Sequence, residues 1–242
     1  MKTTASFPSI SKLLMVVAVC GLSACAVLKT PGYDEFQGAV RKGSAIQIYD
    51  TLEFLIAGND DSPSDRKAAF RAVRYRKEDT AEFQFAWAAI AGRLVQQRGL
   101  LGIDLVGDIE THAIRSRELD PTYRNGAATR LLGTMYVIAP SSFLEHGNSE
   151  LGLEMLEGLV AEYPNDPENH LRLAEAYIAL NDPQPAHSHL CVCMAVATNM
   201  RADDRKLLKN LMADAGKVEC PGAKMPEPKK RSLAQRLWPG GE

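Results

Sequence analysis

Residues 167–197 read PENHLRLAEAYIALNDPQPAHSHLCVCMAVA. Apolar and small side chains recur in this stretch at spacings of three and four, which places them on one face of a helix. The pattern predicts two successive helices, over residues 168–181 and 186–199. Leu173 and Ala174, a large and a small residue on the first helix, are expected to pack against Ala186 on the second. The stretch therefore predicts an antiparallel helix hairpin.

The hairpin pattern occurs more than once, which indicates an internal repeat. Its spacing is that of the tetratricopeptide repeat, at Leu173, Ala174, Tyr177, Asn181, Ala186, Leu190 and Cys193. An earlier copy contains Leu132, Gly133, Tyr136, Gly152, Leu156, Leu159 and Pro164. The two tyrosines are 41 residues apart, against about 34 in the usual repeat, because a loop is expected between Ala139 and Ser149. A third, degenerate unit is expected between Ala88 and Pro121. We therefore expect a tetratricopeptide-like α-solenoid, with an irregular helical bundle as the alternative.

Helical periodicity extends over most of the remaining chain. Further helices are predicted over residues 44–57, 80–97, 105–117, 150–163 and 202–216, with another one after Ser64. No run of residues alternates as a strand bounded by hairpin turns would. The fold class is therefore predicted to be all-α, with a helical domain over residues 44–222 and a basic, flexible tail over residues 223–242.

The N-terminal residues have the pattern of a bacterial lipoprotein signal. An apolar run over residues 13–20 is too short to span a bilayer and is followed by Leu22-Ser23-Ala24-Cys25, which resembles a lipobox. Residues 1–24 are thus a predicted signal peptide, Cys25 the predicted lipidation site, and residues 25–43 a tether. Acyl chains such as palmitate would hold the protein durably on a membrane. Because Ala26 is not the Asp that favours inner-membrane retention, the periplasmic side of the outer membrane is the predicted location.

Charge and composition exclude several classes of protein. Hydrophobic residues make up 45% of the 242 positions, which is typical of a folded chain and not of a disordered one. The 28 basic and 30 acidic residues give a net charge of -2, so the chain as a whole has no positive field that would hold nucleic acid. Removal of Lys2 and Lys12 with the signal peptide leaves 26 basic residues, and the charge becomes -4.

The central part of the chain resembles a known family. The stretches 115–121, 126–140 and 167–176 are similar to the T-component lipoproteins of tripartite ATP-independent periplasmic (TRAP) transporters. This resemblance implies a helical lipoprotein in the periplasm that partners a solute-binding receptor and is, in some members, a trimer with a central pore. We therefore expect a homo-oligomer or a receptor as the partner.

The predicted function is that of a membrane-anchored adaptor that binds a periplasmic protein. In similar proteins the first helix of each repeat supplies partner contacts, which here would come from Thr129, Arg130, His170, Arg172 and Glu175. Arginine suits this role because its planar fork donates two hydrogen bonds to a carboxylate. The alternative is a carrier of a small or hydrophobic ligand in a channel. No standard catalytic motif occurs, so we predict neither enzymatic activity nor a cofactor.

Histidine and cysteine alternate over residues 187–193, as metal ligands could. Residues two apart on a helix point in different directions, so each face would supply only two ligands and we predict no metal site. In an oxidising periplasm a disulfide between Cys220 and either Cys191 or Cys193 is expected. We favour Cys191, since Cys193 shares the buried face with Leu190.

Overall fold

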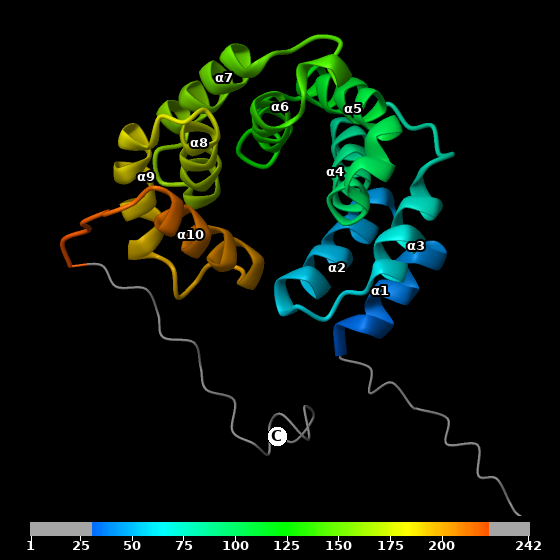
Figure 1. The fold of residues 1–242 in the computed structure, drawn as a ribbon. Helices are drawn as coiled ribbons and strands as arrows, with labels where there is room; N and C mark the ends of the chain where they lie inside the picture. The colour runs from blue at the N-terminus through cyan, green and yellow to red at the C-terminus, as the bar shows by residue number, and fades with distance from the viewer. Residues whose placement is uncertain (1–30, 223–242) are drawn as a thin grey trace, which may run out of the picture.

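The computed structural model describes residues 31–222, and within that range every regular element is helical (Figure 1). In chain order the elements are α1 (Pro31–Lys42), α2 (Ala45–Gly58), α3 (Pro63–Val73), α4 (Ala81–Arg98), the 3-10 helix η1 (Gly99–Leu105), α5 (Val106–Leu119), α6 (Ala127–Ile138), the 3-10 helix η2 (Ser141–Phe143), α7 (Ser149–Glu162), α8 (Pro167–Ala179), α9 (Pro183–Ala195) and α10 (Ala202–Asp214). The all-α prediction is confirmed for this part of the chain.

The helices are arranged as a ring of hairpins. The pairs α4–α5, α6–α7 and α8–α9 form extensive contacts, and α10 contacts α2, so the last helix meets the N-terminal group. Figure 1 shows α4, α6 and α8 on the inner side of the ring, with α5, α7 and α9 outside them. The inner helices therefore surround a central space.

Short polar side chains start several of these helices by accepting hydrogen bonds from free backbone amides. The Ser44 hydroxyl accepts from the Gln47 N–H, and the Gln47 side chain accepts from the Ser44 N–H, which completes a capping box for α2. Asn148 accepts from Leu151 at the start of α7, and Asp166 from Glu168 at the start of α8. The loops between helices thus end at defined positions.

The α6–α7 hairpin depends on two facing glycines. A Cβ added to Gly152 would lie 2.7 Å from the backbone oxygen of Gly133, and one added to Gly133 would lie 2.8 Å from the Leu156 side chain. Only glycine lets the two backbones approach this closely. The predicted small-residue contact between these helices is therefore present.

The interior contains two large apolar clusters. The first cluster is formed mainly by the helices from α1 to α6 and includes the fully buried side chains of Phe36, Ile48, Leu52 and Ile90. The second joins α8, α9 and α10 around Leu171, Leu190 and Leu208. A smaller cluster of Leu156, Leu173 and Ala176 connects α7 with α8. The cores follow the ring and leave its centre open.

The helical part of the chain begins earlier than expected. Residues 31–42, assigned to the tether from the sequence, form α1, whose Phe36 side chain is completely buried. The spacing of Tyr33, Phe36 and Val40 is helical and was the signal that could have identified this helix. Burial of Phe36 against the first cluster explains why the segment is ordered as a helix.

Several sequence predictions lie outside the described residues. These are the signal peptide over residues 1–24, the lipidation site Cys25 and the tail over residues 223–242. Among residues 31–222, no helix combines the length and the apolar character needed to cross a bilayer.

Candidate functional site

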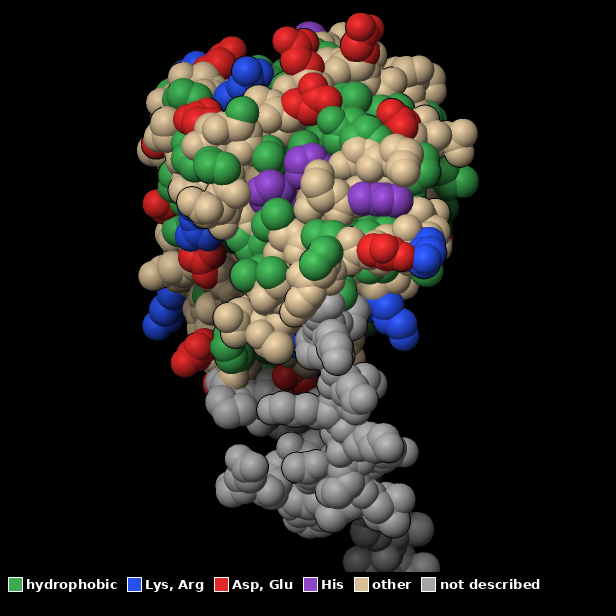
Figure 2. Space-filling model, turned by 90° about the vertical axis from the view of Figure 1, so that its left-hand side faces the viewer, with side chains coloured by type: hydrophobic (Ala, Val, Ile, Leu, Met, Phe, Trp, Pro, Cys, Tyr) green, Lys and Arg blue, Asp and Glu red, His purple; other side chains and the backbone are tan. Residues whose placement is uncertain are grey.

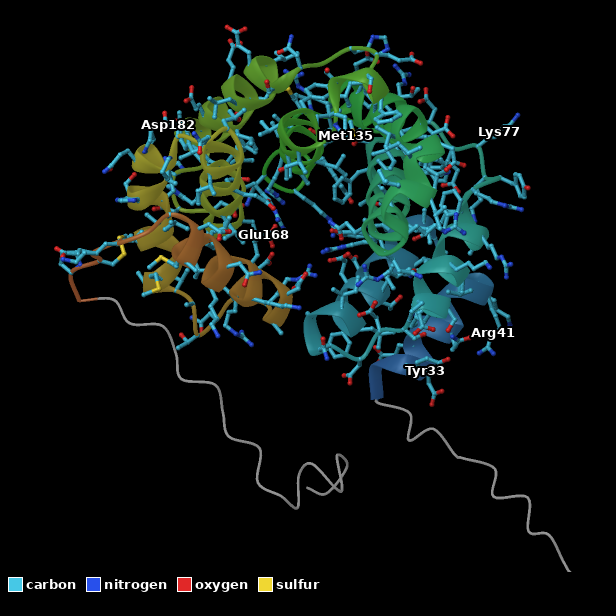
Figure 3. The ribbon with its side chains drawn as sticks, in the orientation of Figure 1. Tyr33, Arg41, Lys77, Met135, Glu168 and Asp182 are labelled. Atoms are coloured by element: carbon cyan, nitrogen blue, oxygen red, sulfur yellow. A yellow bond between two sulfur atoms is a disulfide. The ribbon has the colours of Figure 1, made fainter. Side chains whose placement is uncertain are left out.

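A cavity of about 540 Å³ occupies the centre of the ring. Side chains from α2, α4, η1, α5, α6, α8 and α10 line it, so helices far apart in sequence contribute to one site. Figure 3 shows Met135 of α6 and Glu168 of α8 on the inner side of the ring, and both residues line the cavity. The cavity therefore results from the ring arrangement of the helices.

One wall of the cavity is apolar. It is formed mainly by α4, η1, α5 and α6, with Phe85, Val95, Leu100, Ile103, Val106, Ile109, Leu131, Met135 and Ile138. The wall extends to the surface, where the side chains of Leu100 and Ile138 are 80% and 52% exposed. Thr134 also lines the cavity, and its hydroxyl is buried without a hydrogen-bond partner among the described residues.

The facing wall carries charged residues of α4, α8 and α10, and two of its arginines are held by the buried Glu53 carboxylate of α2, which does not itself line this cavity. Arg93 of α4 donates two hydrogen bonds to this carboxylate, at 2.7 and 2.6 Å. Arg201, at the start of α10, approaches the same carboxylate at 2.5 Å. The Glu53 side chain is only 8% exposed, so its charge is balanced mainly by these two guanidinium groups. The three residues join α2, α4 and α10 at the point where the ring closes.

Two neighbouring carboxylates of α10 pair with arginines of this wall, and of the two only Asp204 lines the cavity. Asp203 accepts two hydrogen bonds from Arg201, at 3.1 and 3.0 Å, while Asp204 pairs with Arg172 at 3.2 Å. Burial raises the pKa of Asp204 against the effect of Arg172, whereas the pKa of Asp203 is lowered because Arg201 and Arg93 outweigh its burial. The two carboxylates therefore differ in their electrostatic environment although they are adjacent in sequence.

A second cavity of about 750 Å³ adjoins the first. The two share six lining residues, namely Tyr49, Phe85, Ala127, Arg130, Glu168 and Arg201. Most residues that line the second cavity have polar side chains, and several of them, such as Asn125 and Asp166, lie in the α5–α6 and α7–α8 connections. The shared residues thus separate an apolar chamber from a polar one.

Three of the five predicted partner-binding residues line these cavities. Arg130 lies between the chambers, where it pairs with Glu168 at 2.9 Å and donates to the Asn169 side-chain oxygen at 2.6 Å. Arg172 and Glu175 lie on the charged wall of the first cavity and pair with each other at 2.8 Å. Thr129 lines neither cavity. The sequence missed Glu53, Arg93 and Arg201, because nothing in their local pattern indicates that they meet.

His170 requires a correction, because its side chain is only 6% exposed. Its Nε2 donates to the Pro164 carbonyl at 2.8 Å, and its Nδ1 lies 2.9 Å from Nδ1 of His189, at hydrogen-bonding distance. Figure 2 shows histidine side chains gathered on the face formed by the C-terminal helices. A partner docked on that face would not reach the buried ring of His170.

The alternating histidines and cysteines are divided among separate contacts. Cys191 forms a disulfide with Cys220, with 5.2 Å between their Cα atoms. Cys193 is a buried thiol, and burial raises its pKa to about 12. His187 donates to the Ala215 carbonyl at 3.3 Å. Among residues 31–222 no group of three or more acidic, histidine or cysteine side chains could hold a metal ion.

Comparisons with known proteins leave the cavity without an assigned ligand. The chain matches no model of a protein family, and no curated protein is significantly similar to it in sequence. The resemblance to TRAP T-components therefore stays a prediction. Function has to be inferred from the residues that line the two chambers.

The first prediction concerns the closure of the ring. Glu53→Gln is expected to lower the free energy of unfolding by about 3–5 kcal/mol, because it leaves Arg93 and Arg201 without their shared carboxylate. Asp79→Asn is the control, since it breaks an ion pair with Arg115 in which both side chains are exposed. Urea unfolding followed by circular dichroism measures both variants. Equal stability of the two variants would contradict a central role for Glu53.

The second prediction concerns pH. Burial, followed by the influence of His170, holds the pKa of His189 below its usual value. The unfolded chain therefore binds this proton more readily, and the associated stability is present above about pH 6.5 and lost below it. We expect the urea midpoint to fall between about pH 7.5 and pH 5.5, and His189→Gln to flatten that dependence. Identical pH dependence in the variant and the wild type would refute the assignment.

Proposed function

We propose that this protein binds a small amphiphilic ligand in its central cavity. The observation that carries the proposal is one chamber in which an apolar wall faces a charged one. The volume of about 540 Å³ lies within the range of about 300–1,000 Å³ that is common for small-molecule sites. Such a ligand would place its apolar part against α4, η1 and α6 and its polar part toward α8 and α10.

The charged wall limits which polar group a ligand in this cavity can carry. The cavity is lined by four arginines, Arg93, Arg130, Arg172 and Arg201, and by three acidic residues, Glu168, Glu175 and Asp204. Glu53 and Asp203 do not line it but pair with the arginines. Each of the four arginines already pairs with a carboxylate, so a simple anion would have to displace one. An uncharged or zwitterionic group that forms hydrogen bonds fits this balanced wall better.

We also propose that the helix hairpins are tetratricopeptide-like repeats. Equivalent residues of the two copies are buried in the same way: Gly133 corresponds to Ala174, and Leu156 to Leu190. In the α6–α7 hairpin the buried small residue of the first helix is Gly133, and in the α8–α9 hairpin it is Ala174. This similarity supports a solenoid whose two ends have come together, and it accounts for the cavity as the space inside the curve.

The cellular setting is proposed from the sequence. The apolar segment before Cys25 supports export and acylation, which would place the helical domain on the periplasmic side of the outer membrane. A chain anchored there could receive a ligand from, or deliver it to, a soluble periplasmic protein. Binding in the cavity needs no catalytic group, which agrees with a non-enzymatic carrier.

A second candidate function is that of an adaptor for a periplasmic protein, such as a solute receptor. It is favoured by exposed apolar side chains at the cavity mouth, where Leu100 is 80% exposed and Leu101 84%. A partner seated on η1 would cover this mouth. The two functions are compatible, because the partner could be the protein that exchanges the ligand.

The ligand-binding proposal predicts a loss of binding when the cavity is filled. Gly92 lines the cavity and has open space around its Cα, so Gly92→Phe should place a ring in the chamber without distorting α4. Binding of the neutral fluorescent probe N-phenyl-1-naphthylamine should weaken at least tenfold, which is about 1.4 kcal/mol. Gly158→Phe on exposed α7 surface is the control. Unchanged probe binding by Gly92→Phe would overturn the proposal.

The adaptor proposal predicts that a charge at the mouth blocks docking. Leu101→Glu should abolish the recovery of a crosslinked periplasmic protein from intact cells, since a partner would have to bury the new carboxylate. Leu180→Glu, at a 38% exposed apolar position on the C-terminal half, should leave recovery unchanged. Crosslinking followed by mass spectrometry reports the partner. Failure of the wild-type chain to capture any protein would exclude this function.

A further inference from the structure

A stripe of positive charge follows the outer surface of α3. Lys67, Arg71 and Arg74 stand four and three residues apart, so their side chains lie on one side of the helix axis. All three are exposed, and none forms an ion pair with a residue of the described range. Lys77, also exposed, follows three residues after Arg74. The stripe is therefore available to a partner.

The end of α1 adds two more cations to the stripe. Arg41 and Lys42 are exposed in the last turn of α1. Arg76 joins this turn to the end of α3, because its side chain donates to the Gly43 carbonyl at 2.8 Å and to the Ala72 carbonyl at 2.9 Å. Figure 3 shows Arg41 and Lys77 on the outer side of the ring, away from the cavity. We call Arg41, Lys42, Lys67, Arg71, Arg74 and Lys77 the basic patch.

An aromatic ring stands within the basic patch. The Tyr75 side chain is 78% exposed, and the Arg74 guanidinium lies 4.2 Å from the centre of its ring. Tyrosine is amphipathic and is enriched at the level of lipid headgroups, where the ring is partly buried and the hydroxyl stays in water. Cations beside an exposed tyrosine are a combination that suits a lipid surface.

Two simpler explanations do not account for the patch. Basic residues often complement the dipole at a helix C-terminus, which explains Arg41, Lys42 and Arg71 but not Lys67, in the middle of α3. Nearby acids do not neutralise it fully, because Asp79 is engaged by Arg115 at 2.6 Å and Glu78 carries a single charge. The inner arginines, such as Arg93 and Arg172, are by contrast all paired.

We propose that the basic patch binds the surface of an anionic phospholipid bilayer and so holds the α1–α3 end of the ring against the membrane. Only five residues lie between Cys25 and Pro31, a reach of at most about 20 Å, so a lipid anchor would hold this end close to the membrane surface. Clustered Lys and Arg residues are attracted to anionic lipids over such distances. The contact would fix the orientation of the cavity relative to the bilayer. The proposal rests on the proposed membrane location but not on the proposed ligand.

A membrane fits the patch better than an acidic protein does. The patch residues line neither of the two cavities, and its one large exposed apolar group is the Tyr75 ring. Specific protein interfaces usually contain a buried apolar centre with aromatic anchors seated in pockets. A lipid surface requires only charge and a shallow aromatic contact.

The test is vesicle flotation of the exported chain with Cys25→Ser, so that no acyl chain contributes. The vesicles contain phosphatidylcholine alone or an equimolar mixture with phosphatidylglycerol. We expect the protein to float with the mixed vesicles only, and to be released by high salt because the attraction is screened. The variant Lys67→Glu/Arg71→Glu/Arg74→Glu should reduce flotation at least tenfold, and Tyr75→Ala should reduce it by a smaller factor.

The matched control is Lys206→Glu/Lys209→Glu/Lys217→Glu, which changes the net charge equally at exposed positions on and after α10. Both triple variants keep the basic residues 229–236, so a contribution from the tail is the same in each. Circular dichroism checks that all variants are folded. Equal flotation of the two triple variants, or equal binding of the wild type to both vesicle types, would overturn the proposal. Capture of an acidic protein through these residues without flotation would also overturn it, in favour of a protein partner. Because no acyl chain is present, neither failure bears on acylation of Cys25 or on the cavity ligand.

Discussion

The structure depends on a buried carboxylate shared by two arginines. Glu53 is almost inaccessible to solvent, so its charge is tolerated only while Arg93 and Arg201 remain beside it. Those three residues come from α2, α4 and the start of α10, and their pairing requires the first and last parts of the fold to meet. An open curved array of hairpins is thereby turned into a ring.

Ring closure has a direct consequence for the interior. The apolar clusters lie between neighbouring helices, and the centre is too wide for side chains to fill it. The close backbone approach at Gly133 and Gly152 makes one hairpin compact, yet it does not reduce the central space. The cavity is thus a product of curvature. Its two walls differ because α4 and α6 supply apolar residues, whereas α8 and α10 supply charged ones.

The outer surface has a separate role in this arrangement. Inside the ring the arginines are paired with carboxylates, while the cations of the basic patch are left exposed. An unpaired surface charge costs little in water, whereas an unpaired buried one is expensive. Basic residues therefore stabilise the fold where they lie inside the ring, and they are free to interact with a partner where they lie on its outer surface.

Local patterns in the sequence determined the helices, because the three-and-four spacing of residues such as Leu173, Tyr177 and Leu190 requires only a few neighbouring positions. They also indicated Arg130, Arg172 and Glu175 as partner-binding residues, and the structure places these three on the lining of the cavity. The sequence did not reveal α1, which is ordered as a helix because Phe36 is buried against distant helices. It also did not reveal that the side chain of His170 is almost inaccessible to solvent. Tertiary structure alone decided that Glu53, Arg93 and Arg201 meet and enclose a cavity. Their separation of up to 148 positions carries no periodic signal, because contacts across a ring depend on the summed curvature of every hairpin between them.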